Sequence, residues 1–154
     1  VFVGIESINP ESIKKTKRQN APIDKQLRSI KILEKNGISV KAMFIFGFPG
    51  DNLKNALKTI NYALSLPITY LQFSVFTPYP GTPIFSEYKD KITAKNFEEY
   101  TQWDLVFNHE NLTKMDIKYL LNKSYTNFYS SIPRLARIFY RITKIELRKR
   151  FGIF

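Results

Sequence analysis

The sequence predicts an α/β fold with parallel strands, and three observations carry this prediction. Short apolar runs rich in β-branched and aromatic residues recur along the first half of the chain, as is typical of buried strands. Amphipathic segments of helical length separate these runs. Crossovers of that length connect parallel strands, so we expect successive right-handed βαβ units.

The three predicted strands cover residues 2–5, 40–46 and 70–76. Each is apolar almost without interruption, and such strands are usually buried on both faces. The sequence begins inside the first of them and has no signal sequence, so we expect it to be part of a longer protein.

Two long helices are predicted between these strands. Residues 22–36 place an apolar residue every three or four positions, and Gly37 follows as a stop signal. Residues 53–65 show the same periodicity, and Pro67 lies beyond their end. A shorter helix is expected after Asn9 and Pro10, because asparagine caps helices and proline suits their first turn.

The alternation of predicted strands and helices ends after residue 76. Residues 77–83 hold three prolines and one glycine, which indicates a stiff loop at a strand end. Thr113 and Asp116 have the spacing of a capping box and predict a helix up to about residue 130. A final helix is predicted from Pro133.

Composition excludes several classes of protein. Of 154 residues, 44% are hydrophobic and 24% charged, which is ordinary for a folded domain and unlike disordered or collagen-like chains. Cysteine is absent, so these residues offer no disulfide, thiolate metal ligand or cysteine nucleophile. The net charge of +11 favours anionic partners without choosing among nucleic acid, phospholipid and acidic substrates.

Candidate functional residues follow the predicted strands, because parallel α/β folds bind ligands at the carboxyl ends of strands. Glu6 could accept hydrogen bonds from both hydroxyls of a ribose, or serve as a helix cap or ion-pair partner. Residues 47–51 could approach a ligand closely or form a plain turn capped by Asp51 or Asn52; they lack the lysine of a phosphate-binding P-loop. We expect His109 to be non-catalytic and Trp103 to belong to the core.

Three segments together resemble the later half of the radical S-adenosylmethionine (SAM) domain, most closely in the branch with an upstream cobalamin-binding domain. They are FVGIES, GISVKAMFIFGFPGDN and FSVFTPYPGTPIF, and the helical spacer with Lys17 fits the same order. The resemblance implies the C-terminal half of a partial TIM-like (β/α)6 barrel over residues 1–88, followed by a helical extension over residues 89–154.

The resemblance also implies cofactors and site residues. A 4Fe-4S cluster held by a CxxxCxxC loop outside this segment would bind SAM and cleave it to a 5'-deoxyadenosyl radical. Such radicals functionalise C–H bonds, and methylation is implied if cobalamin is bound upstream. The family's SAM contacts fall on residues at the three strand ends: Glu6 and Ser7 for ribose, Ile45, Phe46 and Gly47 near adenine, and Phe76 and Thr77 for backbone contacts to adenine.

This sequence departs from the family pattern on its second strand. Met43 replaces the first glycine of GxIxGxxE, and Gly50 stands at the position of its glutamate. The acid of a variant pattern matches Asp51, whose role is left open. An alternative from another enzyme class is a barrel hydrolase that uses Glu6 and Asp51 as paired carboxylates.

The tail after residue 131 carries seven basic residues and one acidic residue, a net charge of +6. We expect its apolar stripe to close the barrel while its charges stay in solvent. The alternative is contact with an anionic membrane, as in a basic peripheral-membrane or adaptor module without catalysis. The expected location is cytoplasmic, with or without membrane association. The expected partners are a small or lipid-like substrate and a reductant such as flavodoxin or ferredoxin, and nucleic acid ranks below both.

Overall fold

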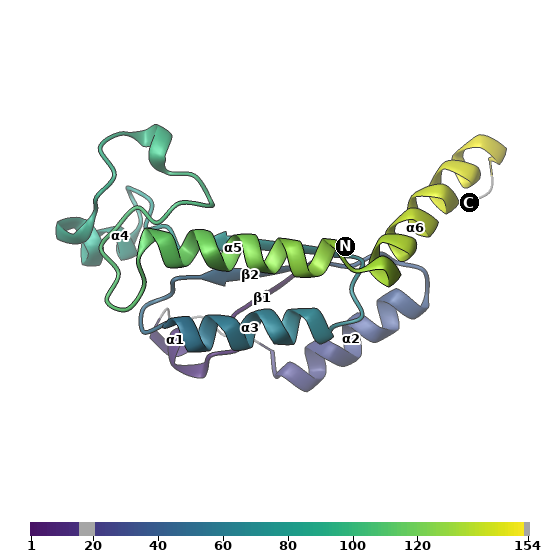
Figure 1. The fold of residues 1–154 in the computed structure, drawn as a ribbon, viewed down its shortest axis with the longest axis horizontal. Helices are drawn as coiled ribbons and strands as arrows, with labels where there is room; N and C mark the ends of the chain where they lie inside the picture. Colours follow the sequence, from purple (N-terminus) through teal and green to yellow (C-terminus); the bar gives the residue numbers. More distant parts are fainter. Residues whose placement is uncertain (16–20, 153–154) are drawn as a thin grey trace.

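The computed structural model describes residues 1–15 and 21–152 and has a three-stranded parallel sheet at its centre (Figure 1). Strands β1 (Phe2–Glu6), β2 (Lys41–Phe46) and β3 (Tyr70–Val75) lie in the order β1-β2-β3. The predicted strands are confirmed to within one residue at each end. Each pair of neighbouring strands is connected through helices, as the predicted βαβ units require.

The crossover helices are α1 (Pro10–Lys15), α2 (Ile23–Lys35) and α3 (Leu53–Ser65). Asn9 accepts a hydrogen bond from the Glu11 amide, and Asn52 accepts one from the Asn55 amide, so both asparagines cap the helices that follow them. The expected positions of all three helices are therefore confirmed.

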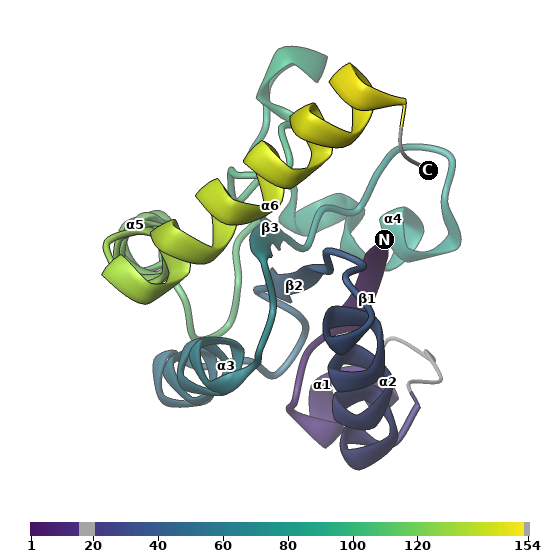
Figure 2. The ribbon, with the colours of Figure 1, turned by 90° about the vertical axis from the view of Figure 1, so that its right-hand side faces the viewer.

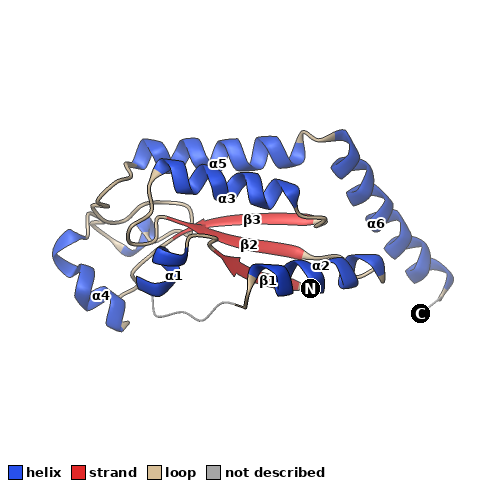
Figure 3. Cartoon of the chain, turned by 90° about the horizontal axis from the view of Figure 1, so that it is seen from below, coloured by secondary structure: helices blue, strands red, loops and turns tan. Residues whose placement is uncertain are grey.

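The sheet is buried on one face, and the prediction of two buried faces is wrong. Every second residue of β2 and β3 is buried, and the residues between them are half-buried. The buried side chains belong to the core on the side of the sheet where α2, α3 and α5 lie (Figure 3), whereas the alternate side chains of β2 and β3 stay half-buried on the opposite face. We call this opposite face, which includes Gly4, Met43, Ile45, Gln72 and Ser74, the open face.

After β3 the chain forms short elements and then a long helix. The short ones are α4 (Pro83–Tyr88), η1 (Lys89–Lys91) and η2 (Phe97–Glu99), and Ile92 pairs with Phe107 in an isolated antiparallel bridge. Helix α5 (Lys114–Tyr129) starts with the predicted capping box, in which each of Thr113 and Asp116 accepts a hydrogen bond from the other's backbone amide through its side chain. It runs beside α3 and along the outer edge of β3 (Figures 1 and 3).

Two tyrosines of α5 close the outer edge of β3. The Tyr129 hydroxyl accepts from the Leu71 amide at 3.1 Å and donates to the Leu71 carbonyl at 3.0 Å. The Tyr125 hydroxyl does the same for Phe73, at 3.0 Å in both directions. These hydroxyls replace a neighbouring strand, because each satisfies one amide and one carbonyl that an edge strand otherwise leaves unpaired.

The last helix, α6 (Ile132–Phe151), packs in a way that the sequence did not predict. None of its residues is buried, and the expectation that its apolar stripe closes a barrel is wrong: Ile138 is half-buried, and the other members of the stripe are exposed. Two of its arginines face the rest of the fold instead. Arg134 donates to the Leu64 carbonyl near the end of α3, and Arg141 donates to the Glu34 carbonyl at 2.8 Å near the end of α2.

The physical reason lies in what α2 and α3 present to α6. The last turns of these helices carry carbonyls without helical partners, which need hydrogen-bond donors and not apolar groups. Arg141 also pairs with the Glu34 carboxylate at 3.0 Å, with side-chain exposures of only 12% and 8%. Arg134 and Arg141 occupy the face of α6 that contacts α2 and α3, so most of the apolar stripe lies outside this contact and stays exposed.

Among the described helices, none is both long enough and apolar enough to cross a bilayer.

Candidate functional site

The three strand ends that the sequence singles out lie next to one another. Because β1, β2 and β3 are parallel and adjacent, Glu6 at the end of β1 lies at the same end of the sheet as Gly47 and Phe76, which follow β2 and β3. The register supports this, since Phe46 pairs with Val75 and Glu6 pairs with Phe44. The loops that leave this edge gather at the end of the molecule opposite α6 (Figure 1).

Glu6 has a backbone conformation that is rare for a residue with a side chain. Its φ is 68°, the only positive φ among the described residues other than glycine. The Ser7 amide donates to the Ile5 carbonyl at 2.9 Å, so Glu6, which lies between them in the chain, is the central residue of a γ-turn. The γ-turn with positive φ is the more strained of the two kinds, and such strain of about 1–3 kcal/mol is found mostly at functional sites.

A β-bulge directs the Glu6 carboxylate onto the open face. The pairing of β1 with β2 shifts between Gly4 and Glu6, so that one extra residue, Ile5, is inserted. Bulges of this kind re-aim side chains, often beside active sites. Here the carboxylate lies over Gly4, since a Cβ at Gly4 would come within 2.7 Å of Glu6 Oε1. Glycine at position 4 therefore leaves room for a half-buried carboxylate at the strand end.

Asp51 has a structural role and is buried, with 4% of its surface exposed. One carboxylate oxygen accepts from the Ser12 hydroxyl and from the Asn9 side-chain Nδ2 at 3.3 Å, and the other accepts from the Phe48 backbone amide at 3.0 Å. Asp51 thus ties α1 to the turn after β2, so it does not offer a free carboxylate for hydrolysis. The sequence left the role of this residue open, and burial together with three donors decides it.

Ser7 belongs to the same hydrogen-bonded turn. It is buried, and its hydroxyl accepts from the Asn9 amide at 3.0 Å, which fixes the chain between β1 and α1. The Ser7 side chain therefore holds Glu6 in place from the carboxyl side, while its amide closes the γ-turn from within.

The carboxyl end of β2 is held by the core. The Phe46 ring stacks on Phe73 with centroids 4.3 Å apart, and its carbonyl accepts from the Phe76 amide at 2.8 Å. Gly47 has a φ of 79°, which favours glycine. Ile45 precedes Phe46 on β2 and is half-buried, because successive side chains of a strand point to opposite faces. Its side chain therefore lies on the open face.

His109 also supports this turn through both of its ring nitrogens. Its Nδ1 accepts from the amides of Asn111 at 3.1 Å and Leu112 at 3.2 Å, so its Nε2 carries the proton that it donates to the Phe48 carbonyl at 3.0 Å. Both ring nitrogens are therefore used within the fold.

Phe76 and Thr77 lie at the end of β3. The Phe76 ring packs against Phe48, Tyr88 and Phe107, at centroid distances of 5.4, 5.9 and 5.9 Å. The Thr77 hydroxyl donates to the Val75 carbonyl at 3.0 Å. Both side chains thus stabilise the strand end, which leaves the backbone as the part of this segment suited to contact a ligand.

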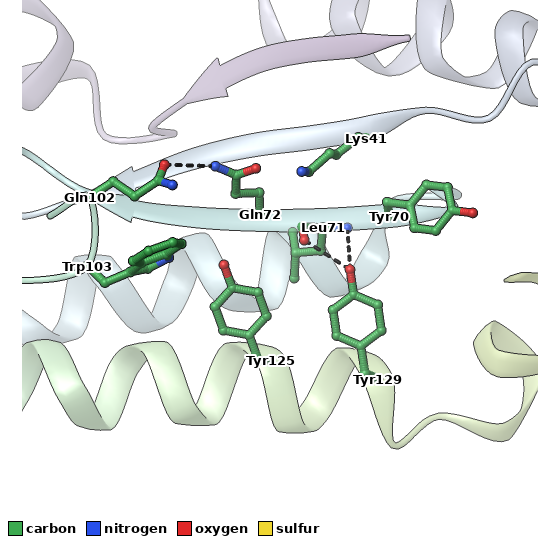
Figure 4. A pocket seen from close by; sticks show the side chains of 8 residues that line it. All are labelled: Lys41, Tyr70, Leu71, Gln72, Gln102, Trp103, Tyr125 and Tyr129. Atoms are coloured by element: carbon green, nitrogen blue, oxygen red, sulfur yellow. Dashed lines mark hydrogen bonds between the residues drawn. The ribbon is translucent and has the colours of Figure 1, made fainter.

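A groove of about 490 Å³ runs along β3 on the open side of the sheet (Figure 4). Its lining includes Lys41, Gln72, Gln102 and Trp103, and the Gln72 amide donates to Gln102 at 3.2 Å. The Trp103 side chain is 50% exposed, so the prediction that it belongs to the core is wrong. An indole face with amides and an ammonium nearby suits a flat ligand that carries acceptor groups.

The described residues offer groups suited to a nucleoside, and no cluster of metal ligands is found among them. The carboxylate of Glu6 is an acceptor of the type that binds ribose hydroxyls. Within residues 1–15 and 21–152, no three His, Asp or Glu side chains are grouped to hold a metal ion, and the sequence has no cysteine for an iron–sulfur cluster. Lys17 of the motif spacer lies outside the described residues.

Sequence reasoning missed two features of this site. The left-handed conformation of Glu6 has no signal in the sequence, because the residue is not glycine. The tyrosine pair had a faint one, since Tyr125 and Tyr129 are four residues apart on one helix face. Only the position of α5 beside β3 shows what the two hydroxyls do.

Comparison with known proteins finds relatives among methyltransferases. An uncharacterized methyltransferase of Pyrococcus horikoshii is 33% identical over 132 residues, which cover 84% of this chain and 28% of that protein. Bacteriochlorophyllide d C-12(1)-methyltransferase of Chlorobaculum tepidum is 30% identical over 110 residues, covering 71% and 24%. The chain therefore spans about a quarter of the length of these relatives. No protein-family model matches it.

A solved structure shares the fold. Elp3 of the archaeon Methanocaldococcus infernus, with an N-terminal deletion, superposes with a TM-score of 0.51 and 19% identity over 58% of this chain and 22% of that one. The chain is thus related to a segment of larger enzymes and shares an α/β arrangement with Elp3.

Proposed function

We propose that the full-length protein is a radical SAM enzyme and that this chain supplies one wall of its SAM site, within the C-terminal half of a partial barrel. The observation that carries the proposal is Glu6, a strained, half-buried carboxylate turned onto the open face at the end of β1. It stands at the family's ribose-binding position in the FVGIES motif. The relatives named as methyltransferases support an enzymatic role.

Each strand end has its own part in this proposal. Glu6 accepts hydrogen bonds from the ribose hydroxyls, and Ser7 holds the turn that presents it. Ile45 and Gly47 border the adenine, while Phe46 acts by anchoring the strand in the core. The backbone of Phe76 and Thr77 completes the adenine wall.

The proposed chemistry is reductive cleavage of SAM to a 5'-deoxyadenosyl radical that abstracts hydrogen from a C–H bond. A 4Fe-4S cluster held by cysteines outside these residues would supply the electron, and a flavodoxin or ferredoxin would reduce it. We infer a large, flat substrate such as a tetrapyrrole, since one relative is named for a bacteriochlorophyllide and the groove beside Trp103 offers a stacking surface. Methylation is the proposed outcome if the protein also binds cobalamin.

The test uses the full-length protein, reconstituted with iron and sulfide without oxygen. Glu6→Gln keeps the shape of the side chain but removes its charge, so it should weaken SAM binding by about 1.5–3 kcal/mol, or roughly 10- to 150-fold in Kd. Equilibrium binding of SAM measures this effect. Glu11→Gln, an exposed glutamate in α1, is the matched control and should leave the Kd unchanged.

An unchanged Kd in Glu6→Gln would remove the ribose assignment. If the reconstituted wild type shows neither an iron–sulfur absorption band nor SAM cleavage, the radical SAM proposal itself fails. The two results are independent, because the first concerns one contact of this chain and the second concerns the whole enzyme.

A further inference from the structure

Helix α6 carries a row of large apolar side chains that the fold leaves exposed. Leu135, Phe139, Ile142 and Ile145 are 47%, 72%, 49% and 47% exposed. They are three or four residues apart, so they share one face of the helix. We call these four residues the apolar row. Its exposure is not a result of fraying, since Arg134 and Arg141 fasten the first half of α6 to the ends of α3 and α2.

The same helix has a strong positive charge. It holds seven basic residues against Glu146, and Arg148, Lys149 and Arg150 crowd its last turn. Arg134 and Arg141 are used inside the fold, and Lys149 pairs with Glu146 at 3.2 Å on the surface. Of the remaining cations, Lys144 is half-buried and lies over the Tyr140 ring, whereas Arg137, Arg148 and Arg150 are exposed to solvent; we call these three arginines the outward cations.

The helix lies at the end of the molecule opposite the strand ends that form the candidate site (Figures 1 and 2). Its contacts with the C-terminal ends of α2 and α3 place it there, because each of those helices ends just before a strand begins. A surface that touches the apolar row would therefore leave Glu6 and the strand ends uncovered.

We propose that α6 docks on the surface of an anionic phospholipid bilayer. The apolar row enters the boundary between headgroups and acyl chains, and the outward cations bind lipid phosphates. An amphipathic helix rich in lysine and arginine binds in this way through buried apolar area together with electrostatic attraction. The helix lies on the membrane and does not cross it, in keeping with its charge.

Charge complementarity selects lipid over nucleic acid as the occupant. Contacts with nucleic acid neutralise phosphates with basic side chains and give little use to a continuous row of aliphatic and aromatic groups. A bilayer surface matches both the cations and the apolar row, because its lipid phosphates lie directly above its hydrocarbon. The proposal is independent of the proposed radical SAM chemistry.

The experiment is sedimentation of the full-length protein with vesicles. We expect wild type to sediment with vesicles of phosphatidylcholine and phosphatidylglycerol, and not with phosphatidylcholine alone. Phe139→Ser combined with Ile142→Ser should lower the partition coefficient at least about tenfold, because both side chains lose their burial in lipid. Phe97→Ser is the control, since Phe97 is 76% exposed but lies in η2.

A second pair of variants tests the charges. Arg148→Ser with Arg150→Ser should lower binding about 20- to 30-fold, at roughly fivefold for each cation lost near an anionic surface. Lys54→Ser with Lys58→Ser, at two exposed lysines of α3, should leave binding unchanged. Circular dichroism checks that all variants fold, and none of the substituted side chains is buried.

The proposal is overturned if wild type fails to sediment with anionic vesicles, which would mean that another part of the protein or a second copy covers the apolar row. It is also overturned if the α6 variants and their controls behave alike. Retention on immobilised RNA that is insensitive to Phe139→Ser with Ile142→Ser, without vesicle binding, would assign the charge to nucleic acid instead.

Discussion

Glu6 adopts a left-handed conformation that glycine adopts without cost. The bulge of β1, the γ-turn closed by the Ser7 amide and the buried Ser7 side chain together impose it. The strained conformation positions the Glu6 carboxylate over Gly4 on the open face. A glycine at position 6 would relax the backbone but would have no carboxylate to bind a ligand.

Two substitutions separate the backbone of Glu6 from its carboxylate. Glu6→Gly and Glu6→Ala both remove the carboxylate and all its contacts, but only alanine keeps the penalty for positive φ. We expect the glycine variant to be more stable than the alanine variant by about 1–2 kcal/mol, measured by urea unfolding. Equal stability would show that the turn relaxes and that no strain is held at this residue.

Asp51 gives a second prediction at this scale. Asp51→Asn replaces one acceptor oxygen by a donor that must face either the Phe48 amide or the Ser12 hydroxyl. We therefore expect a loss of about 1–3 kcal/mol in the free energy of unfolding. Asp90→Asn, at an exposed residue of η1, should stay within about 0.5 kcal/mol of wild type.

At the scale of elements, α5 works as the neighbour of β3. Its tyrosines satisfy the amides and carbonyls of Leu71 and Phe73, so this edge of the sheet cannot accept another strand. Burial raises the pKa of the Tyr129 hydroxyl above 10.0, with the Leu71 backbone hydrogen bond as a smaller, opposing cause. The hydroxyl thus keeps the proton that it donates.

This pKa shift predicts how stability changes at high pH. Above about pH 10 the unfolded tyrosine loses its proton while the folded one keeps it, so unfolding releases a proton and rising pH favours unfolding. The contribution of Tyr129 is full below pH 10 and is lost as pH rises through the folded pKa. Tyr129→Phe should therefore show a shallower decline in unfolding free energy above pH 10 than wild type.

The same variant has a cost at neutral pH. Phenylalanine leaves the Leu71 amide and carbonyl without their partner, which should lower the free energy of unfolding by about 1–3 kcal/mol. Tyr119→Phe, at a tyrosine of α5 that is 48% exposed, is the control and should change stability by less than about 0.5 kcal/mol. If both variants lose the same amount, the edge-closing role of Tyr129 is wrong.

At the scale of the whole molecule, one buried ion pair connects the helical tail to the sheet. Glu34 accepts from the Val40 and Thr69 amides at 2.9 Å each, from the Thr69 hydroxyl and from Arg141. It therefore joins the end of α2, the starts of β2 and β3, and α6. The pair holds the apolar row at a fixed place relative to the candidate site.

Breaking this pair should loosen α6. Arg141→Met leaves the buried Glu34 carboxylate with backbone and hydroxyl donors only, and should lower the free energy of unfolding by about 2–3 kcal/mol. Arg137→Met, at an exposed arginine on the same helix, should have little effect. Hydrogen exchange of α6 should rise in the first variant alone, and equal exchange in both would show that the pair does not anchor the helix.

The sequence by itself determined the strands, the crossover helices and the capped start of α5, because periodicity, capping residues and glycine or proline stops act locally. It also placed Glu6, Gly47 and Phe76 at one edge, since parallel strands of successive βαβ units end together. Only the tertiary structure decided the strain at Glu6, the structural role of Asp51, the tyrosines that close β3 and the arginines that turn α6. These depend on which polar groups distant segments leave unsatisfied, and local sequence carries no record of that.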